Sequence, residues 1–113
     1  MMLIHDGNEI GYWRKANAIH KWFVDNVQNG VDDCGDYKVT KEQLIQLQNK
    51  CNEVLDDPNL AKELLPTQSG FFFGETVYED GYYVSLDHTV QIINEILKTK
   101  PYCLDELYYS SSW

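Results

Sequence analysis

The side chains best suited to chemistry lie near the N-terminus, in the stretch YWRKANAIHKWFV. Arg14 and Lys15 are adjacent cations that could hold a phosphate or another anion, and Trp13 offers a ring that could stack against a bound base. Asn17 can donate and accept hydrogen bonds. A histidine such as His20 ordinarily titrates near neutrality, which suits a general acid or base. These five residues are therefore a candidate ligand-binding site.

The two cations also need partners for a structural reason. The stretch predicts a helix that begins at Tyr12, and positive charges in a first helical turn oppose the helix dipole. Acidic side chains such as Glu75 or Asp80, or the terminal carboxylate of Trp113, could neutralise Arg14 and its neighbour. The alternative partner is an anionic ligand such as a nucleotide, and the sequence leaves both open.

A second unusual stretch, PTQSGFFFG, adds candidate binding residues. Gln68 and Ser69 beside Gly70 could present backbone N–H groups and polar side chains to a ligand. Three consecutive phenylalanines cannot all face one side of an extended segment, so at least one points to a second buried surface, a pocket or a partner. These are Phe71, Phe72 and Phe73.

Sequence motifs for established catalytic or metal sites are missing. No Walker A loop, nucleophile elbow or HExxH pattern occurs, and neither His5 nor His88, although His88 follows Asp87, belongs to a metal-binding pattern. The acidic run DDCGD lacks the later bidentate glutamate of a calcium loop. We therefore predict no catalytic residues, no metal and no cofactor.

Composition indicates an ordinary globular protein. The chain has 113 residues, of which 43 % are hydrophobic and 24 % charged, and we expect a single domain over residues 1–113. No stretch approaches the roughly 20 apolar residues that span a bilayer, and the N-terminus lacks the pattern of a signal peptide. We expect a soluble protein of the cytoplasm, with Cys34, Cys51 and Cys103 as reduced thiols.

The net charge of −9 argues against nucleic acid as a partner, because affinity for phosphate backbones rests on lysine and arginine. An acidic surface suits attachment to a basic protein surface, including one that normally binds DNA. High acidity also keeps cytoplasmic proteins soluble without any partner.

Hydrophobic periodicity predicts three long helices and a short one. The first should span Tyr12 to about Gln28 and end at Asn29-Gly30, with an inward face at helical spacing. Its expected core residues are Tyr12, Ala16, Ile19, Phe23 and Val27.

A capping box, Thr40 with Gln43, should open a second helix that ends near Leu55, and Pro58 fits the start of a short helix. The third long helix should begin within residues 80–82 and end near Thr99. The expected fold is a mostly α helical bundle with an aromatic-rich loop and C-terminal segment. The alternative is a small α+β fold in which residues 71–78 and 106–113 pair as strands.

Four strings of the sequence, YWRKANAIHKWFV, DDCGDY, LLPTQSGFFFG and YYSSSW, together resemble a family of small uncharacterised proteins from bacteriophages and prophages. The resemblance covers most of the chain and carries no activity with it. It implies an accessory protein expressed in the host cytoplasm rather than a virion component. Small acidic phage proteins of this kind often inhibit or sequester components of host defence.

Three functions are compatible with these observations. The first is a binding protein that takes a host protein or a small anionic ligand such as a nucleotide. The second is an enzyme that acts on a nucleotide or a nucleic-acid end with His20 as acid or base. The third is a structural homo-oligomer. We rank binding first, because paired catalytic groups are missing from the sequence.

Overall fold

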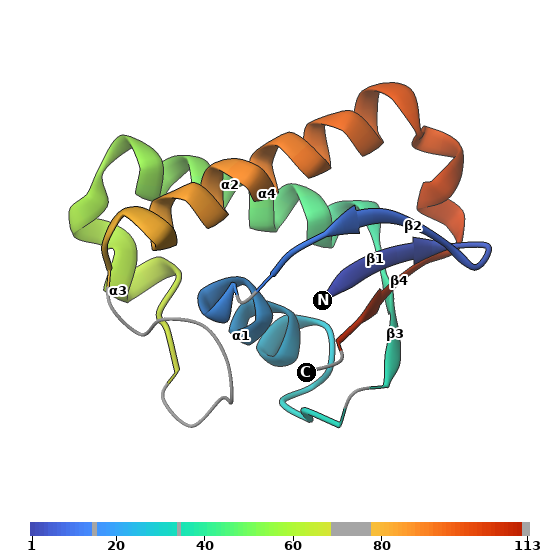
Figure 1. Ribbon diagram of the computed structural model, residues 1–113, viewed down its shortest axis with the longest axis horizontal. Helices are drawn as coiled ribbons and strands as arrows, with labels where there is room; N and C mark the ends of the chain where they lie inside the picture. The colour runs from blue at the N-terminus through green and yellow to red at the C-terminus, as the bar shows by residue number, and fades with distance from the viewer. Residues whose placement is uncertain (15, 34, 69–77, 112–113) are drawn as a thin grey trace.

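The computed structural model describes residues 1–14, 16–33, 35–68 and 78–111 (Figure 1). Within these ranges the chain is α+β: four short strands form one antiparallel sheet, and helices pack against it. The expectation of a mostly α bundle is therefore wrong. In the alternative α+β prediction the C-terminal strand is present, whereas its expected partner falls almost entirely outside the described residues.

The sheet brings the two ends of the described chain together. Its strands are β1 Met2–His5, β2 Asn8–Tyr12, β3 Asp36–Val39 and β4 Leu107–Ser110, in the order β2-β1-β4-β3. β1 and β2 form a hairpin whose turn, Asp6-Gly7, has φ angles of 52° and 77°, the left-handed values of a type I′ turn. β4 pairs antiparallel with both β1 and β3.

One face of the sheet is buried. Leu3, Leu107 and Tyr109 are 0 % exposed and lie on the same face, whereas Tyr108, between two of them, is 38 % exposed. This alternation extends over only four or five residues in each strand. So short a pattern is not distinctive in a sequence, and the partners of β4 lie far away in the chain, which is why the sequence offered a sheet only as the alternative and without these partners.

Helix α1, Asn17–Asn26, lies against the buried face of the sheet. The ring of Phe23 stacks on Tyr109, with centroids 3.8 Å apart. The helix begins five residues later than predicted, because Tyr12 belongs to β2 and pairs with Met2. Tyr12 is 48 % exposed, so its predicted place in the core is wrong. Its spacing from Ala16 matched a helical period only by coincidence.

Four of the remaining helical elements follow the prediction closely: α2 Lys41–Asp56, η1 Pro58–Leu60, α3 Ala61–Leu64 and α4 Asp80–Thr99. A short 3₁₀ helix, η2 Pro101–Asp105, was not predicted. The capping box at Thr40 is confirmed, since both of its hydrogen bonds to Gln43 form. α2 and α4 pack along each other above α1 (Figure 1). No helix in the described ranges is both long enough and apolar enough to cross a membrane.

Candidate functional site

His20 occupies the centre of a buried polar junction between α1 and the sheet. It is 0 % exposed. Its Nε2 lies 3.0 Å from Oδ1 of Asp32, and its Nδ1 lies 2.6 Å from the hydroxyl of Tyr109. Because a carboxylate only accepts hydrogen bonds, Nε2 carries the proton and Nδ1 accepts from the Tyr109 hydroxyl. Both ring nitrogens are therefore engaged inside the protein.

Burial decides the charge state of this junction. Desolvation lowers the pKa of His20, although the hydrogen bond and charge of Asp32 oppose that change. Desolvation also raises the pKa of Tyr109 well above its ordinary value, and the nearby Asp32 charge adds to it. At neutral pH the histidine is uncharged and the tyrosine protonated. These hydrogen bonds join α1 to β4 and to Asp32 in the connection between α1 and β3. They leave neither ring nitrogen of His20 exposed to a substrate.

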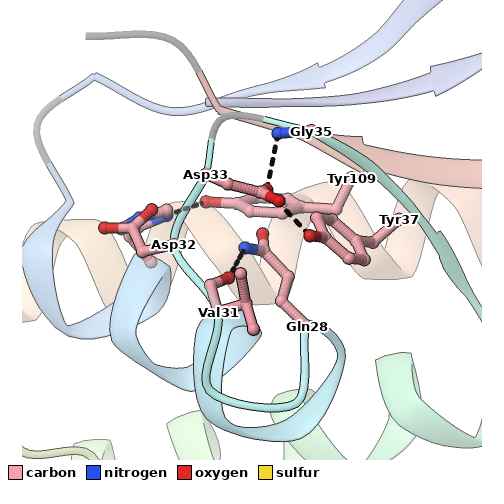
Figure 2. Close-up of polar contacts among 8 residues, drawn as sticks. Gln28, Val31, Asp32, Asp33, Gly35, Tyr37 and Tyr109 are labelled. Atoms are coloured by element: carbon pink, nitrogen blue, oxygen red, sulfur yellow. Dashed lines mark hydrogen bonds and ion pairs between the residues drawn. The ribbon is translucent and has the colours of Figure 1, made fainter.

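The acidic connection that follows α1 is folded by its own hydrogen bonds (Figure 2). Oδ1 of Asp33 accepts from the backbone N–H of Gly35 at 3.0 Å and from the Tyr37 hydroxyl at 2.7 Å. The Tyr37 bond is the main reason that the pKa of Asp33 is lowered. Nowhere in the described ranges do three His, Cys, Asp or Glu side chains gather in a way that could hold a metal ion.

Trp13 is a core residue. It is 2 % exposed, and its Nε1 donates to Oγ1 of Thr89 on α4 at 2.8 Å. Its ring makes edge contacts with Phe23 and Tyr109. A side chain packed in this way cannot serve as an open stacking plane for a base.

Arg14 is exposed and lies outside the helix that was expected to contain it. Because α1 begins at Asn17, the argument from the helix dipole is wrong for this residue. Arg14 forms no ion pair with any residue that the structure describes, Asp80 included. Lys15 and the other two suggested partners lie outside the described ranges.

Asn17 joins the two stretches that the sequence singled out. Its Nδ2 donates to the backbone oxygen of Gln68 at 3.0 Å, and its Oδ1 accepts from the Gln68 N–H at 2.7 Å. The paired bonds fix the backbone of residue 68 against α1. Ser69, Phe71, Phe72 and Phe73 lie outside the described residues, so the second half of the candidate site is not placed.

The opposite side of α1 lines a cavity that the sequence interpretation missed. It has a volume of about 90 Å³ and lies between α1, Lys50 of α2 and the segment from Leu64 to Pro66. Trp22 lines it and is 5 % exposed, yet its Nε1 has no hydrogen-bond partner among the described residues. The sequence does place Lys21, Trp22 and Asp25 close together on the predicted helix. Their spacing alone does not distinguish the lining of a cavity from an ordinary exposed helix face.

Comparisons of this chain with models of protein families, with curated proteins and with solved structures found no match.

Proposed function

We propose that this protein acts by binding a basic partner protein through an acidic surface, in the cytoplasm of a phage-infected bacterium. The partner's face is of the kind that binds nucleic acid, and occupation of that face inhibits the partner. The resemblance to phage accessory proteins supplies the setting. The distribution of charge supplies the chemistry, and it is the observation that carries the proposal.

Most carboxylates are exposed to solvent and form no ion pair with a described residue. Seventeen of the 18 acidic residues fall in the described ranges, and every one of those seventeen is exposed. Among them, Asp25 and Glu95 form ion pairs with lysines in the described part of the chain, and Asp32 accepts a hydrogen bond from the neutral His20. The other fourteen face solvent without a salt bridge to a described residue. Unpaired surface carboxylates repel one another, and a basic partner would relieve that repulsion.

Six of these carboxylates gather at one end of the molecule. The C-terminal part of α2, the turn through η1 and α3, and the start of α4 meet there (Figure 1). A hydrogen bond from the Tyr82 hydroxyl to the backbone oxygen of Leu65 ties α4 to the α3 segment. We call this group the acidic end. Its members are Glu53, Asp56, Asp57, Glu63, Glu79 and Asp80.

Binding fits the geometry better than catalysis does. The sequence-based candidate for acid–base chemistry, His20, is fully buried and hydrogen-bonded through both ring nitrogens. Trp13 and Asn17 are likewise committed to packing and to backbone hydrogen bonds. About half of the exposed residues in the described ranges are charged, and such side chains suit a surface contact.

The test begins with partner capture from a bacterial lysate on the immobilised chain, followed by purification of the captured protein and measurement of Kd. The decisive variant combines Glu53→Gln, Asp56→Asn and Glu63→Gln at the acidic end. A matched control combines Asp6→Asn, Glu9→Gln and Asp105→Asn, which removes the same charge near the β1–β2 turn and η2.

We expect the first triple to weaken binding by at least about tenfold and the control by less than about twofold, with strong weakening as salt increases. Equal losses from the two triples would contradict docking at the acidic end. A Kd that is insensitive to salt would contradict the electrostatic mechanism itself.

A further inference from the structure

The four-stranded sheet has a second face that stays open to solvent. Phe23 of α1 stacks on Tyr109, so α1 packs on the buried face. Gly11 of β2 belongs to the same face, and a Cβ built there would lie 2.7 Å from the Ile92 side chain of α4. Successive side chains of a strand alternate between the two faces. Tyr108, which is 38 % exposed, therefore belongs to the second face, which we call the open face.

One row of side chains crosses the open face from edge to edge. Strand pairing aligns four residues, one from each of β2, β1, β4 and β3: Glu9, Ile4, Tyr108 and Lys38. The two inner residues are largely apolar, whereas the two outer residues are exposed and carry opposite charges. Neither Glu9 nor Lys38 forms an ion pair with a residue that the structure describes. The row is therefore acidic at one edge of the sheet, apolar in the middle and basic at the other edge.

A second row lies beside the first and is also different at its two ends. In the same strand order its residues are Tyr12, Met2, Ser110 and Asp36. Tyr12 is 48 % exposed, and Asp36 is exposed at the opposite edge of the sheet. A tyrosine hydroxyl can donate a hydrogen bond and a carboxylate can accept one. The two ends of this row are therefore complementary as well.

Both rows are complementary to a second copy of themselves. When two open faces meet, a two-fold axis parallel to the strands reverses the strand order and keeps each row at its own height, so β2 of one copy lies over β3 of the other. Glu9 then faces Lys38 of the second copy, and Tyr12 faces Asp36 of the second copy. The apolar middles of the rows cover each other. Facing sheets in β-sandwiches keep their strands within about 30° of one another, which this axis allows.

Net charge restricts where two copies can meet. Each copy has a net charge of −9, so like charges oppose contact between most pairs of surfaces. The two rows contain two carboxylates and one lysine, a net charge of only −1. The face is small, since four strands about 4.8 Å apart and four residues long extend over roughly 19 by 13 Å. A standard interface buries about 800 Å² on each partner, so contact through this face alone is weak.

We propose that two copies of this protein associate through their open faces as a two-fold dimer, with the apolar middles in contact and the charged ends paired. The dimer is reversible, with an expected Kd of about 10–100 μM. The sheet and the acidic end lie at opposite ends of the molecule (Figure 1). Dimerisation therefore leaves the acidic end free for a basic partner, and neither proposal depends on the other.

Sedimentation velocity at chain concentrations from about 5 μM to 1 mM tests the dimer. The first variant is Lys38→Glu, which sets Glu9 of each copy against a second carboxylate and should raise Kd by at least about tenfold. Lys98→Glu is the matched control, because Lys98 is exposed on α4 and its replacement changes the net charge equally. We expect it to change Kd by less than about twofold.

An exchange of the two charges then tests the arrangement. The double variant Glu9→Lys with Lys38→Glu has the net charge of the natural chain, and it pairs the row ends again with their signs exchanged. We expect its Kd to return to within about threefold of the original value. Within one copy the two positions lie on opposite edges of the sheet, so an internal ion pair cannot explain the recovery. Pairing of two copies through the β3 edge would bring Lys38 close to Asp36, and Glu9→Lys would not restore it.

The apolar middle is tested by Tyr108→Asp, with Val84→Asp as its matched control. Val84 is 66 % exposed on α4, so each variant removes an exposed apolar side chain and adds one negative charge. Tyr108→Asp should raise Kd by at least about tenfold and Val84→Asp by less than about twofold. If Tyr108→Asp fails to fold, the lysine variants and the charge exchange remain decisive.

Three results would overturn the proposal. The first is a chain that remains monomeric over the whole concentration range. The second is a dimer that both members of a matched pair weaken equally. The third is a dimer that Lys38→Glu weakens and the exchange of charges does not restore, which would assign a different contact to Lys38.

Discussion

Two tryptophans, one before helix α1 and one on it, lie in opposite environments. Trp13, just before the helix, is buried against the sheet, and its N–H donates to Thr89. Trp22, on the helix, is almost as deeply buried but lines a cavity, and its N–H has no described acceptor. Around the first, His20 also has protein partners on both ring nitrogens. Around the second, Lys50 has no ion pair with any described residue.

The difference shows which polar residues of a small protein invite a functional hypothesis. A histidine or an indole with a complete set of internal partners contributes to the fold, however suitable its chemistry. A buried donor without a partner, such as Nε1 of Trp22, is a cost to stability, and it is no sign of a ligand because its surface is closed. On this criterion the side of α1 that faces the sheet has its polar groups paired, whereas Trp22 leaves one described donor unpaired.

The largest expected effect comes from replacing Tyr109, which lies at the centre of the contact between α1 and the sheet. Tyr109→Leu would lose the stacked contact with Phe23 and leave Nδ1 of His20 without its donor. We expect a loss of about 3–5 kcal/mol in the free energy of unfolding, measured by urea denaturation. Tyr108→Leu, at the neighbouring exposed position, should change it by less than about 0.5 kcal/mol. Similar losses at both positions would contradict the description of a one-sided sheet.

The two tryptophans can be compared directly by Trp13→Phe and Trp22→Phe. The first removes a satisfied hydrogen bond to Thr89, whereas the second removes an unsatisfied donor and so relieves the cost of burying it. In urea denaturation, Trp13→Phe should destabilise the protein by about 1–3 kcal/mol more than Trp22→Phe does. Equal destabilisation would mean that the Trp22 N–H is satisfied in the free protein.

The sequence predicted those parts of this fold that depend on local signals. α2 follows from the capping box at Thr40 and from apolar residues at helical spacing, and α4 ends before Pro101 as expected. The sheet depends on pairing between β1 and β4, which come from opposite ends of the chain. Four-residue strands offer too few alternating positions to reveal such pairing.

The candidate site was only partly predictable for the same reason. Residue types drew attention to His20 and Asn17, but their partners are the Tyr109 hydroxyl, 89 residues away, and the Gln68 backbone, 51 residues away. Without those partners a buried structural histidine cannot be distinguished from a general base. Trp22 was passed over because a missing hydrogen bond is a property of the folded structure, which local spacing does not encode.

The buried His20 should also make the free energy of unfolding depend on pH, by less than the core substitutions change it. The folded-state pKa of His20 is lowered from 6.5, so the unfolded chain takes up a proton first as the pH falls. Stability should therefore be full above pH 6.5 and decline below it, measured as the urea midpoint between about pH 7 and 5. His20→Gln should reduce this slope. A midpoint that rises as the pH falls would contradict a buried neutral histidine.

The smallest expected effect concerns a thiol in the interior between α2 and α4. Cys51 is 0 % exposed, and desolvation raises its pKa to about 12, so almost none of it is thiolate at neutral pH. Iodoacetamide should leave Cys51 unmodified in the folded protein and alkylate it in urea, as read by peptide mass mapping. Rapid labelling in the folded state would mean that this interior opens readily, and the contrast between the two regions would then be one of degree.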